Sequence, residues 1–364
     1  MSTDADAAPT GLDLAAVEPL LADRLGPREG GAYRATLVGG GKSNVTYLVD
    51  WADRALVIRR PPIGPHDPRN HDVGREYRVL SALAPTPLPT PQPILNEPTG
   101  EVIGVPFYVM ERVDGRVLRK ADDAPDMADP ARLRRVGEAL VDGLVTLHSL
   151  EPEAIGLGDL GKAQGYIERQ VNRWAGQWER DQQRPIPALD EVGRRLQAAL
   201  ATGAVRANPD RPHLVHGDFN LGNVLIANVD QFDHVPVLRA VLDWEMATLG
   251  HPLMDLGVLI AYNGPHADQV IEEEGSVALR PGFPSPSELV ELYGRRSGND
   301  VSTAPFFEVL AMYKVLVITE DVRARYLAGG TVGAGFDVMG RSVPYLADAL
   351  LETARSSSVP GLSG

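Results

Sequence analysis

Two short segments carry polar side chains that could do chemistry, and in each of them the polar residues adjoin apolar runs. The first segment is Leu214-Val-His-Gly-Asp-Phe-Asn-Leu-Gly-Asn-Val-Leu-Ile226, in which Asp218 and Asn223 stand out. The second is Ala240-Val-Leu-Asp-Trp-Glu245, in which Asp243 directly follows the apolar residues. Short apolar runs of this kind are typical of buried strands, so each polar residue is expected at the end of a strand.

These residue types suit a metal ion and a proton acceptor. If the strands next to Asn223 and Asp243 lie side by side, an amide oxygen and a carboxylate come close together. With waters and phosphate oxygens, this pair suits a hard cation such as Mg²⁺. Asp218 would lie beside them, where it could take a proton from a hydroxyl group. The simpler alternative is that Asp218 and Asn223 cap turns and that Asp243 is a solvated strand end.

The motif His216-Gly-Asp-Phe-Asn-Leu-Gly-Asn223, followed by Leu242-Asp-Trp-Glu245, resembles the catalytic core of the aminoglycoside phosphotransferase family, which has a protein-kinase-like fold. The resemblance implies that Asp218 is the catalytic base and that Asn223 holds the metal ion. It also implies that Asp243 replaces the aspartate of the kinase Asp-Phe-Gly motif. ATP and Mg²⁺ are therefore the expected cofactors, and the γ-phosphate of ATP would move to a hydroxyl of a small molecule.

Within this family, two stretches are similar to the kinase-like domains fused to certain acyl-CoA dehydrogenases. They are Leu242-Asp-Trp-Glu-Met-Ala-Thr-Leu-Gly-His-Pro-Leu-Met-Asp255 and Ile58-Arg-Arg-Pro-Pro62. By resemblance, Asp255 is the aspartate that accepts hydrogen bonds from the backbone of the catalytic loop. The acceptor is left open between an aminoglycoside, another sugar-like alcohol and a hydroxyacyl compound, because its pocket carries no recognisable motif.

A glycine-rich hairpin tip, Gly39-Gly-Gly-Lys-Ser43, lies between two strand-like segments. A Walker A loop is disfavoured because position 36 is threonine and the residues after the tip alternate like a strand. The kinase glycine motif is incomplete because position 44 is asparagine. By the family resemblance the backbone of the tip would cover the ATP phosphates, with a plain β-turn as the alternative. The candidate residues are Gly40, Gly41, Lys42 and Ser43.

The next strand-like run, Ala55-Leu-Val-Ile-Arg59, ends in a basic residue. In kinase-like folds the third strand carries a lysine that contacts the α- and β-phosphates. Arg59 is the candidate for this role, and Arg60 stays open as an alternative because neighbouring strand residues face opposite ways. Residues 72–83 predict a capped helix, on which Glu76 would pair with Arg59 and orient it. The alternative for Glu76 is an ordinary solvated position.

Residues 84–98 are rich in proline and predict an extended loop, and residues 102–111 predict two further strands. The second of these strands leads into a turn that resembles the kinase hinge. By that resemblance, backbone atoms of Glu111 and Val113 would pair with the adenine edge. Residues 1–111 are accordingly expected to form a nucleotide-binding lobe.

The pattern then changes from strands to helices. The order of strands followed by helices predicts an α+β, bilobal protein-kinase-like fold. Its N-lobe would be a small antiparallel sheet with one helix, and its larger C-lobe, residues 112–364, would be mostly helical and hold the catalytic and substrate-binding residues. His148 is expected to be a helix-terminal or core residue and not a ligand. Residues 356–364 are expected to form a loose tail. Apolar residues at helical spacing predict helices near residues 133–148, 163–180, 189–200, 287–296, 304–328 and 343–354.

The composition narrows the classes of partner. The formal net charge of −14 argues against nucleic acid and anionic membrane surfaces. The chain has no cysteine, which excludes disulfides, thiolate metal sites and cysteine nucleophiles. The acidic start has no apolar signal region, and no apolar run approaches the ~20 residues of a membrane helix. We therefore expect a cytoplasmic protein without a membrane partner, as a monomer or weak dimer.

Two alternative functions are considered. One is a small-metabolite kinase with a hydroxyacyl, choline-like or homoserine-like acceptor. A choline kinase needs an aromatic cage, which Trp174, Trp178 and Tyr166 could supply, although helical spacing explains these residues more simply. The other is a non-catalytic nucleotide-binding protein. The incomplete glycine motif and Arg59 in place of lysine favour it, whereas the three intact polar residues Asp218, Asn223 and Asp243 argue against it.

Overall fold

The computed structural model contains two compact units, and each is built around its own core. Unit 1 comprises Met1–Asp114 and a short return segment, Ala240–Glu245, while unit 2 comprises Gly115–Arg239 and Met246–Gly364. The order of elements, mostly strands and then mostly helices, confirms the predicted α+β class. The structure describes residues 9–28, 30–38, 44–64, 71–120, 129–205, 211–228, 234–271, 275–327 and 340–363.

Unit 1 contains a five-stranded sheet in the order β1-β2-β3-β5-β4, in which all neighbouring strands are antiparallel. The predicted hairpin and the strand that follows it are confirmed as the first three strands. The five strands in chain order are β1 (Ala32–Leu37), β2 (Val45–Ala52), β3 (Arg54–Arg60), β4 (Pro93–Glu97) and β5 (Phe107–Glu111).

The prediction for the proline-rich segment was wrong. Residues 84–98 were expected to be a loop, but β4 forms within them and pairs with β5. Only one strand, not two, forms between residues 102 and 111. Pro93 has no N–H to donate, and the sheet accommodates it because it is the first residue of an edge strand.

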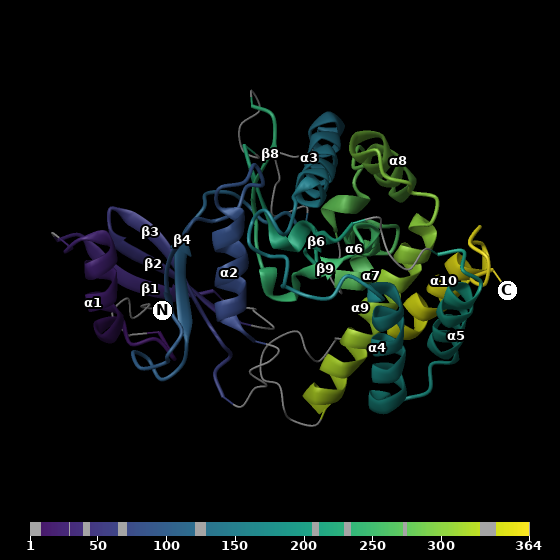
Figure 1. Ribbon diagram of the computed structural model, residues 1–364, viewed down its shortest axis with the longest axis horizontal. Coiled ribbons are helices and arrows are strands. Elements are labelled where there is room, and N and C mark those ends of the chain that lie inside the picture. The colour runs from purple at the N-terminus through teal and green to yellow at the C-terminus, as the bar shows by residue number, and fades with distance from the viewer. Residues whose placement is uncertain are drawn as a thin grey trace. The chain divides into compact units, whose positions relative to one another are not determined.

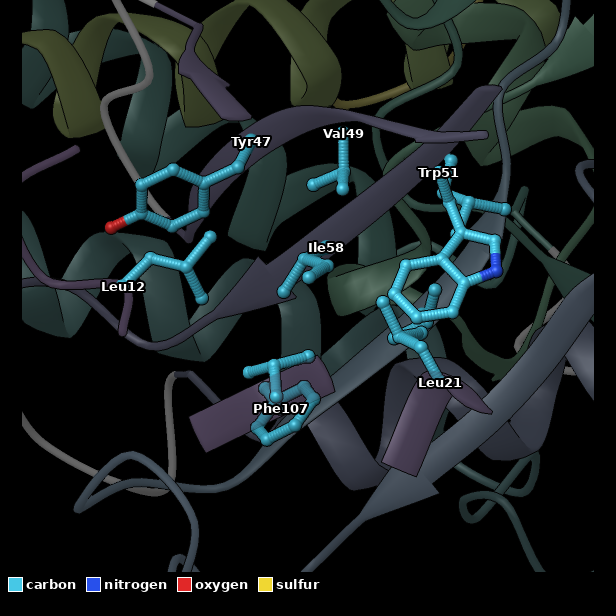
Figure 2. Packing of buried hydrophobic residues seen from close by; sticks show 10 residues of the cluster. Leu12, Leu21, Tyr47, Val49, Trp51, Ile58 and Phe107 are labelled. Carbon is cyan, nitrogen blue, oxygen red and sulfur yellow. The ribbon is translucent and has the colours of Figure 1, made fainter. Parts of the chain in front are cut away.

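Two helices cover the opposite faces of this sheet, as Figure 1 shows for α1 (Leu14–Leu25) and α2 (Val73–Leu83). Val17 and Leu21 of α1 are fully buried in the apolar cluster of Figure 2. The helix α2 packs against β4 and β5. Its first turn is capped as predicted, because the Asp72 carboxylate accepts a hydrogen bond from the backbone N–H of Arg75. The strand residues in the cluster with α1 are Tyr47, Val49, Trp51, Leu56, Ile58, Phe107 and Val109.

Unit 2 is mostly helical (Figure 1), and four of its other helices pack against α9. This helix is buried on nearly all sides over its first four turns, and it packs against α4, α5, α6 and α10, while α3 packs against α8. No helix among the described residues is long and apolar enough to span a membrane. The helices are α3 (Pro130–Ser149), α4 (Tyr166–Asp181), α5 (Pro187–Ala201), α6 (Leu253–Asn263), α7 (Ala267–Ile271), α8 (Pro286–Ser297), α9 (Ala304–Leu327) and α10 (Val343–Arg355).

Two short strand pairs contain or adjoin the two polar segments, residues 214–226 and 240–245. The strand β7 (Val224–Ala227) pairs with β8 (Val237–Val241), as the two apolar runs predict. The strand β6 (His213–Val215) pairs antiparallel with β9 (Thr248–Gly250), which the sequence did not predict. A strand of three residues is too short to show an alternating pattern, so β9 has no signal in the sequence.

The chain end is packed, and the predicted loose tail was wrong. Val359 and Leu362 are 3% and 0% exposed. The carbonyl of Leu362 accepts a hydrogen bond from the guanidinium of Arg195 on α5. Gly361, at φ +86°, lies against Ala199 of the same helix, where a side chain would not fit. Two buried apolar side chains, one glycine and the hydrogen bond from Arg195 therefore hold this segment.

We predict that Leu362→Ala lowers the free energy of unfolding by about 2–5 kcal/mol, because it leaves a cavity against α5. The matched control is Leu279→Ala, since Leu279 is 43% exposed, and its effect should stay within about 0.5 kcal/mol. Urea denaturation followed by tryptophan fluorescence measures both. Equal effects of the two substitutions would show that the tail is loosely held.

Candidate active site

The loop between β6 and β7 is shaped by its own polar residues. After β6, the chain turns at Gly217, which has φ +84°. A Cβ atom at this position would lie 2.8 Å from the carbonyl oxygen of Met246, so only glycine fits without a shift of the backbone. Asn220 then caps a 3-10 turn, Leu221–Asn223, by accepting a hydrogen bond from the N–H of Gly222 at 2.8 Å. This turn ends where β7 begins, so Asn223 stands directly before a strand as predicted.

Asp255 holds the backbone of this loop. Its two carboxylate oxygens accept hydrogen bonds from the N–H groups of His216 and Gly217, both at 2.7 Å. This contact confirms the role that the sequence resemblance gave to Asp255. The carboxylate is fully buried in the first turn of α6, and Nε2 of His148 lies 3.2 Å from it. His148 is itself in the core, as predicted, with Nδ1 2.9 Å from the Tyr293 hydroxyl.

The buried carboxyl of Asp255 is held in its ionised form. Burial alone would raise its pKa, but the hydrogen bond from His148, the nearby histidine rings and the backbone N–H of His216 outweigh burial and lower the pKa. An ionised carboxylate is a stronger acceptor than a neutral one. The two backbone N–H groups of the loop are thus bound by a charged group in a site without solvent.

Asp218 and Asn223 lie side by side in this loop. The amide Nδ2 of Asn223 donates to both the carbonyl and the carboxylate Oδ2 of Asp218, each at 2.8 Å. Because its nitrogen faces Asp218, the amide oxygen of Asn223 points away and can bind another group. The N–H of Asp218 donates to Nδ1 of His216 at 3.2 Å, so the ring of His216 helps to shape the loop.

One charged residue next to this loop was missed. Lys314 on α9 is 3% exposed, and its ammonium donates a hydrogen bond to the carbonyl of Gly217 at 2.5 Å. Burial lowers the pKa of Lys314, and Asp218 and Asp255 act in the opposite direction. The sequence did contain a signal, since Lys314 is a single charge within the apolar run from 309 to 318.

A second cluster lies in unit 1. The guanidinium of Arg59 forms ion pairs with Glu76 at 3.3 Å and with Asp243 at 3.1 Å. Glu76 also accepts a hydrogen bond from the backbone N–H of Trp244 at 3.3 Å. The predicted Arg59–Glu76 pair is therefore present. Burial alone would lower the pKa of Arg59, but Glu76 and the other negative neighbours raise it, so the guanidinium stays charged.

The structure distinguishes the roles of the neighbouring residues Arg59 and Arg60. The two side chains point to opposite faces of the sheet, as neighbouring strand residues do. Arg60 donates to the carbonyl oxygens of Gly11 and Pro61. Of the two basic residues at the end of β3, Arg59 is therefore the one that meets Glu76 and Asp243.

Asp243 has an unusual backbone conformation. Its φ is +63°, in the left-handed region that aspartate adopts more readily than most residues but at a cost of about 1–3 kcal/mol. The surrounding segment is fixed by a hydrogen bond from the N–H of Val241 to the carbonyl of Pro89 at 2.9 Å. At the end of the segment, Glu245 accepts a hydrogen bond from the amide of Asn44 at 3.3 Å. Such strain is commonly found at functional sites.

The remaining predicted nucleotide contacts are placed only in part. The N–H of Glu111 donates to the carbonyl of Gln92 at 2.9 Å, so this N–H is already used within the protein. Val113 follows it in the same unit. The residues of the glycine-rich tip, Gly40, Gly41, Lys42 and Ser43, lie outside the described residues.

The candidate residues thus form two groups. Asp218 and Asn223 are together in unit 2, and Arg59, Glu76 and Asp243 are together in unit 1. The meeting of Asn223 and Asp243 at one cation stays a prediction.

The aromatic residues considered for a choline cage are packing residues. Trp174, Trp178 and Tyr166 are 2%, 3% and 5% exposed. The indole of Trp178 donates to Asp190 at 2.7 Å. These side chains fill the core around α4 and do not support a choline cage.

Comparison with solved structures agrees with this fold. A Ralstonia eutropha protein assigned to the aminoglycoside phosphotransferases is 27% identical, with a TM-score of 0.76 over 95% of this chain and 99% of that one. Aminoglycoside phosphotransferase APH(4)-Ia, solved as a ternary complex with AMP-PNP and hygromycin B, is 16% identical, with a TM-score of 0.60 over 94% and 99%. The fold is the protein-kinase-like fold of these enzymes.

Comparison of sequences identifies the family. The model of the phosphotransferase enzyme family matches residues 34–289, and the chain belongs to this family. Among curated proteins, acyl-CoA dehydrogenase family member 11 is 34% identical in both rat and human, over 96% and 89% of this chain. The match covers 44% and 40% of those proteins, so the chain spans less than half of their length.

We predict that Asp255→Asn destabilises the protein at neutral pH and that the difference from wild type shrinks in acid. The pKa of Asp255 is below its usual 3.8 in the folded state, so its contribution is complete above that value and is lost as the pH falls through the lower, folded-state pKa. Urea denaturation at pH 7 and at several values below 4 measures this. A constant difference across that range would contradict the prediction.

Proposed function

We propose that this protein is an ATP- and Mg²⁺-dependent phosphotransferase that moves the γ-phosphate of ATP to a hydroxyl of a small molecule. The observation that carries the proposal is the contact of Asp218 with Asn223 at 2.8 Å, in a loop whose backbone Asp255 holds. A catalytic base must be oriented before the acceptor arrives, and fixed geometry is a large part of catalysis in phosphoryl transfer. Asp218 would accept the proton of the acceptor hydroxyl.

Asn223 and Asp243 fit the role of ligands to Mg²⁺. The amide oxygen of Asn223 points away from Asp218, and Asp243 supplies a carboxylate. Among the described residues there is no cluster of three or more His, Asp or Glu that could hold a metal ion. That is compatible with Mg²⁺, which usually takes one or two protein oxygens together with waters and substrate phosphates. When bound, the ion would neutralise the charge of the phosphates.

The nucleotide would bind through residues 1–111, and residues 112–364 would supply the catalytic loop and the acceptor pocket. Arg59, oriented by Glu76, would neutralise phosphate charge, as the strand lysine does in kinases. Arginine is always charged and can bind phosphate through two donors at once. We further propose that the carbonyl of Glu111 and the N–H of Val113 pair with adenine, and that Gly40, Gly41, Lys42 and Ser43 cover the phosphates.

Two classes of acceptor molecule fit this proposal. An aminoglycoside-like or other sugar-like alcohol is suggested by APH(4)-Ia, which was solved with hygromycin B. A hydroxyacyl compound is favoured by a different observation, since the identity to acyl-CoA dehydrogenase family member 11 is 34%, against 16% to APH(4)-Ia. A protein that binds nucleotide without turnover is the outcome that would contradict both.

Release of ADP over a panel of aminoglycosides, sugars, amino alcohols and hydroxyacyl-CoA compounds tests the function. We expect turnover with one class, and a loss of about 10²–10⁴-fold in Asp218→Asn, the range typical of a lost general base. The variant should still bind ATP. The matched control is Asp348→Asn, an exposed aspartate on α10, which should behave like wild type. Turnover of Asp218→Asn at the wild-type rate would contradict the assignment of the base.

Removal of the proposed metal ligand has a separate readout. Asp243→Ala should abolish the Mg²⁺-dependent part of ATP binding, because one of two protein ligands to the ion is lost. Isothermal calorimetry with and without Mg²⁺ measures it. Asp23→Ala, at an exposed position of α1, is the control. If the Mg²⁺ dependence survives in Asp243→Ala, the metal has other ligands.

A further inference from the structure

The buried lysine on α9 has no part in the function proposed above. Lys314 lies between apolar neighbours in the central helix of unit 2, and its side chain is 3% exposed. Lysine is almost never this deeply buried unless it is paired, because its ammonium loses the hydration it has in water. A leucine or methionine here would continue the apolar pattern. The cost of burial therefore points to a specific partner for the ammonium.

That partner is a backbone atom in the catalytic loop. The ammonium of Lys314 donates to the carbonyl oxygen of Gly217 at 2.5 Å. Its other neighbours include the sulfur of Met246 at 3.8 Å and the ring of Trp174, whose centroid is 5.8 Å away. The lysine thus reaches from the centre of the helical core to the residue immediately before Asp218.

The contact fixes one particular peptide plane. The carbonyl of Gly217 and the N–H of Asp218 belong to the same planar peptide group. Lys314 binds the oxygen of this peptide group, and Nδ1 of His216 accepts a hydrogen bond from its N–H at 3.2 Å. Asp255 meanwhile holds the N–H of Gly217 at 2.7 Å. Glycine has the widest backbone freedom of any residue, so contacts from outside the loop restrict a position here that would otherwise be free to rotate.

We propose that Lys314 is a positioning residue that fixes the direction of the Asp218 side chain. With the peptide plane before Asp218 held at both ends, the backbone torsion φ and the side-chain torsions of Asp218 remain. The hydrogen bonds from Asn223 to the carbonyl and to the carboxylate of Asp218 restrict both. Lys314 does not touch the acceptor or the nucleotide in this role. The catalytic part of the inference depends on the proposed function, whereas the restriction of the loop does not.

Two substitutions remove the contact in different ways. Lys314→Met keeps the length of the side chain and removes the donor, and Lys314→Ala also leaves a cavity that a small alkylammonium ion can enter. Lys162→Met, at an exposed lysine, is the matched control for loss of one positive charge. Folding of each variant is checked by thermal melting and by calorimetric ATP binding.

We expect kcat to fall about 10²-fold in Lys314→Met, the scale of a small misplacement of a catalytic group, while the KM for ATP stays within about threefold of wild type. Methylammonium or ethylammonium should restore part of kcat in Lys314→Ala and have no effect on Lys314→Met. Wild-type kcat in folded Lys314→Met, or a change confined to the KM for ATP, would overturn the proposal. So would a folded Lys314→Ala that no amine restores.

Hydrogen exchange separates this proposal from the proposed function. The amides of His216 and Gly217 should exchange faster in Lys314→Met than in wild type and in Lys162→Met. This measurement needs no turnover. If wild type transfers no phosphate to any acceptor, the proposed function fails, and exchange alone decides whether Lys314 restricts the loop. Unchanged exchange at these amides would show that it does not.

Discussion

Charged groups taken out of water hold the candidate site in shape. In each unit, a buried carboxylate binds the backbone next to a residue that could take part in catalysis. Asp255 binds the N–H groups of His216 and Gly217, and Glu76 binds the N–H of Trp244. A buried charge without partners is costly, so these carboxylates restrict the backbone in a way that a solvated carboxylate could not.

The partners of the buried carboxylate differ between the two units. In unit 1, Glu76 and Asp243 share the guanidinium of Arg59, which is rigid and always charged. In unit 2, Asp255 accepts hydrogen bonds from the backbone N–H groups of His216 and Gly217 and lies 3.2 Å from Nε2 of His148, while the lysine ammonium binds a carbonyl. A broken buried pair leaves a charge without compensation, which typically costs about 3–5 kcal/mol. These residues are therefore important for the fold as well as for the site.

Much of this arrangement could be predicted from the sequence, because its signals are local. The alternation of apolar and polar residues predicted the strands of the first hairpin. Apolar residues at helical spacing predicted most of the long helices of unit 2. The family resemblance pointed to Asp255 as the residue that binds the backbone of the loop, and the predicted helix of residues 72–83 pointed to Glu76 as the partner of Arg59. The Arg59–Glu76 pair and the Asp255 hydrogen bonds are both present.

What could not be predicted depends on contacts between distant parts of the chain. The prolines of residues 84–98 predicted a loop, although an edge strand begins at Pro93. The strand β9 is too short to show any periodicity. The last residues look loose by composition, yet Leu362 is fully buried and its carbonyl accepts a hydrogen bond from Arg195 of α5. Lys314 was overlooked because helical spacing places it among core residues but does not reveal which atom it binds.

The connectivity of unit 1 has a consequence for any attempt to divide the protein. The chain leaves this unit after Asp114 and returns for only six residues, Ala240–Glu245, before leaving again. A fragment that stops at residue 114 would contain Arg59 and Glu76 but not the aspartate that pairs with the same guanidinium. Unit 1 is therefore not encoded by one continuous stretch of the gene, and splitting the chain at its first boundary would leave a buried arginine with one of its two anions missing.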